Sequence, residues 1–196
     1  MPLTKRQLSL TGLSAVLILG AACVKKPTTA TNAPPPPPVA RAAPAPAAVM
    51  PGALAPTCDD SLSQHVYVGD PRKFHSAKDR LKVITPCMRV TGTIFNAVAE
   101  KDGDFHIRLT VDSQFTGLLN AKNTSGQGGH LVVEPVCESP VTQKDTLKEG
   151  VCKGFSQNLY NASLKGKHVE IVGVYIEDME HGWREIHPVT SIRVIP

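Results

Sequence analysis

Hydrophobic and polar positions alternate along the second half of the chain in a pattern that predicts β-strands. In residues 105–111 the four odd-numbered residues are apolar and the three even-numbered ones are polar, the period of two of a half-buried strand. Apolar and β-branched runs predict further strands at 88–97, 131–136, 169–177 and 185–195. Residues 141–149 follow a proline and are rich in polar helix formers, so they predict one short helix. The folded part is therefore expected to be mainly β.

The order of these elements narrows the architecture. Gly92 lies inside the first predicted strand, where a glycine often marks a bulge or a sharp bend. The predicted order is three strands, one helix and two strands. Together with the glycine in the first strand, this order resembles the OB-fold over residues 85–196. The resemblance implies that the strands close into a small five-stranded barrel. Residues 57–86 would then be an N-terminal extension. A β-sandwich is the competing architecture, although it normally needs about seven strands.

The first 23 residues have the three parts of an export signal. Lys5 and Arg6 precede an apolar run at 8–19, and small residues follow at 20–22. The run is too short to span a bilayer. The ending Leu-Gly-Ala-Ala-Cys resembles the lipobox of bacterial lipoproteins, which implies cleavage after residue 22 and a diacylglycerol on Cys23. Gly20 stands where the lipobox usually has leucine, so ordinary signal cleavage and secretion of a soluble protein is the alternative.

Between the signal and the domain lies a spacer. Two-thirds of residues 27–56 are Pro or Ala, a composition that favours extended polyproline geometry. We therefore divide the chain into a signal peptide (1–22), a lipid anchor with a Pro/Ala-rich linker (23–56) and a folded domain (57–196). The expected location is the cell envelope, in the outer membrane or the periplasm. Val24 after Cys23, instead of Asp, would permit transfer to the outer membrane by resemblance to enterobacterial lipoproteins.

The cysteines suit an exported domain. Setting Cys23 aside leaves an even number, namely Cys58, Cys87, Cys137 and Cys152. We predict two disulfides, and among three connectivities we choose the nearest-neighbour pairs, Cys58 with Cys87 and Cys137 with Cys152. A metal site is the alternative, but no two of the four have the spacing of a Cys-x-x-Cys ligand pair.

The net charge of +4 belongs to the N-terminal end. Five of the 21 basic residues and no acidic residue fall within 1–56, which leaves 16 basic against 17 acidic residues in 57–196. A nucleic-acid-binding domain needs a basic face, so this balance argues against nucleic acid as a partner. The membrane is the expected partner of the N-terminal lipid, with Lys25 and Lys26 beside anionic headgroups.

Two polar segments are candidates for a binding site, because the OB-fold resemblance implies that their turns meet at one rim of the barrel. They are residues 102–106 and 178–188. The ligand-binding candidates on them are Asp102, Asp104, His106, His181, Trp183, Glu185 and His187. No cofactor is expected. The alternative is a divalent metal, since imidazoles and carboxylates are suitable ligands, held by Asp104, His106, Glu134, His181, Glu185 and His187.

A structural interpretation competes with both kinds of site. Asp102 and Gly103 are suited to a hairpin turn. Trp183 would then close one end of the barrel, and Glu185 and His187 would form a hydrogen-bond network without a ligand.

The phrases DGDxH and HGWxEIHP at 102–106 and 181–188 resemble a group of uncharacterised bacterial exported lipoproteins with an OB-fold-like domain. The resemblance implies a fold and a location but no reaction. We predict a surface-tethered, non-enzymatic envelope lipoprotein whose domain binds an envelope protein or a saccharide. The alternative is a metal-dependent hydrolase acting on phosphodiesters. The arginine pair of staphylococcal-type nucleases has no clear counterpart, because Arg108 and Arg184 are isolated, and no hydrolase elbow or P-loop is present.

Overall fold

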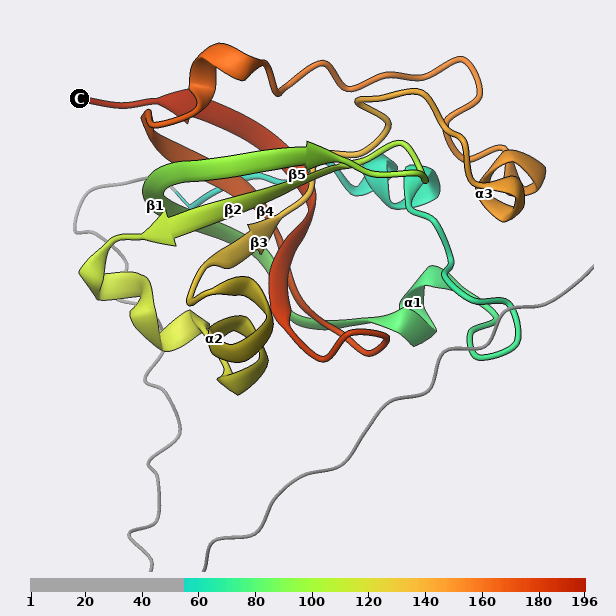
Figure 1. Ribbon diagram of the computed structural model, residues 1–196, viewed down its shortest axis with the longest axis horizontal. Helices are drawn as coiled ribbons and strands as arrows, with labels where there is room; N and C mark the ends of the chain where they lie inside the picture. Colours follow the sequence, from blue (N-terminus) through green and yellow to red (C-terminus); the bar gives the residue numbers. More distant parts are fainter. Residues whose placement is uncertain (1–54) are drawn as a thin grey trace, which may run out of the picture. The chain divides into compact units, whose positions relative to one another are not determined.

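The computed structural model describes residues 55–196 (Figure 1). The predicted signal peptide, the lipid attachment at Cys23 and nearly all of the linker lie outside these residues. The described part is mainly β, as the alternating patterns predict. Its elements in chain order are the 3₁₀ helix η1 (Asp60–His65), α1 (Ala77–Arg80), β1 (Leu81–Ala99), β2 (Phe105–Val111), η2 (Ser113–Leu118), α2 (Ala121–Gln127), β3 (Leu131–Val133), α3 (Lys144–Glu149), η3 (Ala162–Leu164), β4 (His168–Asp178) and β5 (Arg184–Val194).

The five strands form one sheet in which the first and last neighbours meet. Their order is β1-β2-β3-β5-β4, and β4 pairs back onto β1. All pairs are antiparallel except β3 with β5, which is parallel. Each strand therefore has a neighbouring strand on both sides, although β3 contacts β5 over only two residue pairs (Figure 1).

Strand β1 is long because it pairs with two neighbouring strands along its length. Its first part pairs with β4 and its second part with β2, and Gly92 pairs with both. A Cβ at this position would overlap the Thr110 carbonyl of β2, so glycine allows the close approach of the strands here. The irregularity in pairing with β2 falls between Ile94 and Asn96, two residues after the glycine.

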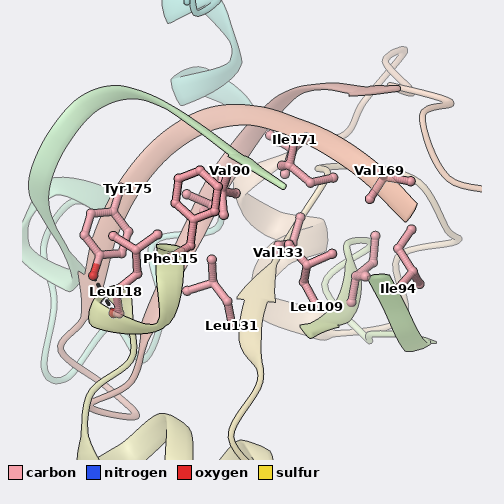
Figure 2. Packing of buried hydrophobic residues seen from close by; sticks show 13 residues of the cluster. Val90, Ile94, Leu109, Phe115, Leu118, Leu131, Val133, Val169, Ile171 and Tyr175 are labelled. Carbon is pink, nitrogen blue, oxygen red and sulfur yellow. Dashed lines mark hydrogen bonds between the residues drawn. The ribbon is translucent and has the colours of Figure 1, made fainter. Parts of the chain in front are cut away.

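The interior of the sheet is a single apolar cluster (Figure 2). It consists of Val90, Ile94, Ile107, Leu109, Phe115, Leu118, Leu131, Val133, Val169, Ile171, Tyr175, Ile186 and Val189. The one polar group that Figure 2 shows among them is the Tyr175 hydroxyl, which donates to the Leu118 carbonyl. Burying such aliphatic side chains stabilises by roughly 1.5–3 kcal/mol each, so this cluster holds the strands at fixed positions.

Both predicted disulfides are present, Cys58–Cys87 and Cys137–Cys152. The first ties the N-terminal extension to β1. The extension also packs Leu62 and Val66 against a second apolar cluster that contains Val136 and Ile176. Two disulfides are typical of proteins in extracellular or periplasmic compartments. None of the described helices is long and apolar enough to cross a membrane.

The prediction of one short helix was wrong, because the described chain has three α-helices. The polar stretch around 122–129 forms α2, although glycine, serine and asparagine are poor helix formers. The two ends of the helix compensate for this low helix propensity. Asn120 and Asn123 form a capping box at the start, and Gly128 ends the helix in the left-handed conformation. The predicted helix at 141–149 is shorter than expected, as α3 begins at Lys144. Strand β3 is also shorter, ending at Val133 instead of residue 136.

Candidate functional site

Glu134 follows β3 directly and lies between two histidines. The antiparallel register of β2 with β3 and the parallel register of β3 with β5 bring His106 and His187 to either side of it. The Nδ1 atom of His106 lies 2.9 Å from Glu134 Oε1, and that of His187 lies 2.9 Å from Glu134 Oε2. One buried carboxylate therefore bridges two imidazoles. Although burial raises the pKa of Glu134, the hydrogen bonds from both histidines outweigh it and hold that pKa below its usual value.

His106 carries a proton on both ring nitrogens. Its Nε2 lies 3.0 Å from Gln127 Oε1. Arg108 Nε donates to the same Gln127 atom at 2.8 Å, and since arginine is only a donor, that atom is the amide oxygen. His106 Nε2 must therefore donate as well. Burial lowers the pKa of His106, but the bonds to Glu134 and Gln127 raise it to about 9.

His187 is 1 % exposed and is oriented by carboxylates. Its Nδ1 faces Glu185 Oε1 at 3.2 Å in addition to Glu134. The other oxygen of Glu185 accepts from Trp183 Nε1 at 2.8 Å. Burial lowers the pKa of His187, yet its carboxylate neighbours raise it well above the usual value. Burial also raises the pKa of Glu185.

An open cleft of about 770 Å³ borders this cluster. Seven of its lining residues are acidic: Asp70, Glu100, Asp102, Glu134, Asp145, Asp178 and Glu180. Its only arginines and lysines are Arg72, Arg80 and Lys101, and the first two are paired with Asp70 and Asp178. Trp183 and Tyr67 add aromatic surface. With His106 and His181, the lining has five basic residues against seven acidic ones, so acidic residues remain in excess beside an aromatic wall.

The carboxyl groups closest to the histidines hold protons tightly. Burial raises the pKa of Glu100 to about 7 and that of Asp104 to about 8, and neighbouring carboxylates add to both effects. Burial and Glu134 raise the pKa of Asp102 in the same way. The raised pKa values follow from the burial of several carboxyl groups close to Glu134.

The turn between β4 and β5 forms the rim of the cleft. Asp178 holds it: one carboxylate oxygen accepts from the Glu180 and His181 amides, and the other lies 3.3 Å from Arg80 Nη1 and 2.9 Å from His181 Nδ1. The ring of His181 stacks on Trp183 with centroids 4.4 Å apart. This arrangement fixes Trp183 at the wall of the cleft.

Helix α2 supports the same wall through a buried asparagine. The Nδ2 atom of Asn123 donates to the carbonyls of His130 and Arg184, while its Oδ1 accepts from the amides of Asn120 and Arg184. The side chain is 0 % exposed. Asn123 therefore joins α2, which carries Gln127, to the start of β5, which carries Glu185 and His187.

The residues proposed from the sequence fall into two groups. The cluster behind the cleft contains Asp104, His106, Glu134, Glu185 and His187. The cleft wall contains Asp102, His181 and Trp183. His181 is bound to Asp178 and stands apart from the other members of the suggested metal set.

Other polar residues of the site were missed by the sequence analysis: Arg80, Glu100, Gln127 and Asp178. Asp178 is the first residue of the second polar segment and Glu100 lies two residues before the first segment, so their positions could have indicated them. Gln127 gave no signal because its segment was predicted to be a loop.

Three sets of side chains in the described residues could each bring ligand atoms within 4.8 Å of one another. They are Glu100–His106–Glu134, Asp104–Glu134–His187 and Asp104–Cys137–Cys152. The third set is unsuitable because its two sulfurs form a disulfide.

No protein-family model matches this chain, and neither a curated protein nor a solved structure is significantly similar to it.

Proposed function

We propose that this protein is an envelope-tethered binding module, in which an OB-fold-like barrel binds a positively charged group of an envelope protein in the acidic cleft. A lipid on Cys23 and the Pro/Ala-rich linker would hold the domain at the membrane. The strand order β1-β2-β3-β5-β4, with its parallel β3–β5 pair, supports the OB-fold comparison. The observation that carries the proposal is the excess of acidic residues around one cleft, where seven acidic residues stand against five basic ones, Arg72, Arg80, Lys101, His106 and His181.

The wall of the cleft suits the same ligand. An ammonium or guanidinium group is attracted to the face of a tryptophan and to carboxylates nearby. Trp183 lines the cleft together with Asp178, Glu180 and Glu100. The lining therefore offers both kinds of group to a lysine or arginine side chain of a partner protein.

A hydrolase remains the second candidate. Glu100 favours it, because a carboxyl group with a pKa of about 7 at the edge of a cleft, beside His106, is suited to proton transfer. The same acidic surplus argues against a phosphodiester substrate, whose negative charge the cleft would repel. Release of nitrophenol from bis-nitrophenyl phosphate by the purified protein would favour this second function over the first.

Binding can be followed with the protein's single tryptophan, Trp183. Titration of the full-length protein with tetralysine should change its fluorescence in a saturable way, and added salt should weaken binding because exposed charges are screened. Tetraglutamate should have no effect. The double variant Asp145→Asn/Glu180→Gln should bind about fivefold more weakly, at roughly 0.5 kcal/mol for each partly exposed charge.

The matched control is Asp60→Asn/Glu177→Gln, which removes two charges from residues that do not line the cleft. It should bind as the wild type does. An equal loss in both double variants, or no response to tetralysine, would remove the cleft as the binding site.

A further inference from the structure

Behind the cleft floor, two buried polar atoms face each other without a hydrogen bond. Asp104 Oδ2 and His187 Nε2 lie 3.5 Å apart, and neither has a hydrogen-bond partner. Asp104 is 2 % exposed and His187 is 1 % exposed. Buried polar side-chain atoms are nearly always satisfied, and an exception needs an explanation.

Both side chains are held so that these atoms point at each other. Asp104 Oδ1 accepts from the Cys137 amide at 2.8 Å, which leaves Oδ2 free. The Nδ1 atom of His187 is directed at Glu185 and Glu134, and Trp183 fixes Glu185. A metal-binding histidine usually donates its other N–H to a carboxylate in this way, which turns the lone pair of the second nitrogen towards the metal.

The separation of the two atoms suits a shared ion. Ligands about 2.1 Å from one ion, at a tetrahedral angle, lie roughly 3.4 Å apart, close to the 3.5 Å between Asp104 Oδ2 and His187 Nε2. Glu134 belongs to the same group, since one ligand atom from each of Asp104, Glu134 and His187 lies within 4.8 Å of the others. Glu185 also contacts His187 Nδ1 and can orient that ring by itself, so Glu134 would exchange its bonds to the histidines for the ion.

We propose that Asp104, Glu134 and His187 form a binding site for a divalent transition-metal ion of the zinc class. The alternative set Glu100–His106–Glu134 is less suitable, since both ring nitrogens of His106 already have hydrogen-bond partners, whereas His187 Nε2 has none. Imidazole with carboxylates selects zinc-like ions over magnesium or calcium, which prefer oxygen ligands alone. This site goes beyond the proposed cleft function and does not depend on it.

The test uses full-length protein with Cys23→Ser in every sample, which removes the one cysteine outside the two disulfides. The protein is stripped with chelator, dialysed against zinc and analysed for bound metal by mass spectrometry. We expect one zinc per chain and a rise in melting temperature on zinc addition. Asp104→Asn and His187→Gln should each weaken zinc binding by roughly 100-fold or more.

A second aspartate–histidine pair provides the matched control. Asp112 and His168 lie 3.0 Å apart on the partly exposed side of the domain, and the variants Asp112→Asn and His168→Gln should retain zinc. Loss of zinc in these variants to the same extent, or stripped wild-type protein that takes up none, would overturn the proposal.

The buried variants could fail to fold, so a second measurement uses the wild type. X-ray absorption spectroscopy at the zinc edge identifies the atoms that bind the ion. The spectrum should show one imidazole, oxygen ligands and no sulfur. A sulfur ligand, or the absence of imidazole, would refute this site.

Discussion

Asn123→Asp tests whether helix α2 holds the site in place. The substitution keeps the size of the side chain and the oxygen that accepts from the Asn120 and Arg184 amides. It replaces the Nδ2 donor, which bonds the carbonyls of His130 and Arg184 at 3.1 and 2.8 Å. Two carbonyls then lose their partner and face a carboxylate oxygen.

The expected cost follows from these two lost bonds. A buried acceptor left unsatisfied costs about 1–3 kcal/mol, so the free energy of unfolding should fall by about 2–4 kcal/mol at neutral pH. This is a large part of the roughly 5–15 kcal/mol that stabilises a typical domain. Protonation of the new carboxyl group would restore one donor, so the loss should shrink as the pH is lowered.

Urea unfolding, followed by Trp183 fluorescence and by circular dichroism, measures this change. Asn161→Asp is the matched control: Asn161 is exposed, and its side-chain oxygen only accepts, from the Ser163 amide and hydroxyl. This control should stay within about 0.5 kcal/mol of the wild type. An Asn123→Asp protein as stable as the Asn161→Asp protein would refute the role given to α2.

Three further predictions concern the fold and its pH dependence. Reduction of the two disulfides should lower the free energy of unfolding by about 3 kcal/mol each on the chain-entropy model, measured by urea titration with and without reductant. Gly92→Ala should destabilise by about 1–3 kcal/mol, since its Cβ would overlap the Thr110 carbonyl, whereas Gly126→Ala in helix α2 should be neutral or slightly stabilising in the same assay. The hydrogen bond to Asp178 raises the pKa of His181. Its contribution to stability is therefore fully present below about pH 6.5 and is lost as the pH rises through the raised value, so the stability deficit of His181→Gln should shrink at high pH; a constant deficit would contradict this.

The strands were the most predictable part of the fold, and β2 shows why. Its alternation of apolar and polar residues matches a strand with one buried face, and the structure gives the predicted bounds of 105–111. The start of β1 was placed seven residues too late, because Pro86 interrupts the strand pattern of residues 81–87. Pairing with β4, which no local pattern encodes, extends the strand there.

Helix α2 could not be predicted from propensity, since capping and a tertiary contact stabilise it. The capping box of Asn120 and Asn123 is visible only once the helix exists. The bonds from Asn123 to Arg184 join positions 61 residues apart. For the same reason the sequence indicated the acidic and histidine residues of the two polar segments but not Gln127, whose contact with His106 depends on α2.

The polar cluster between β2, β3 and β5 is costly for a domain of this size, because buried charges lose their hydration. A network that served stability alone would leave every buried atom paired, since an incomplete network is worse than an apolar core. This network pairs both nitrogens of His106 but leaves Asp104 Oδ2 and His187 Nε2 without hydrogen bonds. Asp104 Oδ2 and His187 Nε2 have only each other, at 3.5 Å, and the proposed ion would give both atoms a partner.

Glu134 connects the two proposed sites, because it lines the cleft and also reaches Asp104 and His187. An ion that drew Glu134 away from His106 would leave the positive charge of that imidazolium uncompensated at the cleft floor. A cationic ligand in the cleft would then meet more repulsion. Zinc should therefore weaken tetralysine binding in the wild type, and by linkage tetralysine should weaken zinc binding by the same factor. Tetralysine titrations with and without zinc measure this coupling, and equal affinities in both would show that Glu134 does not move between the sites.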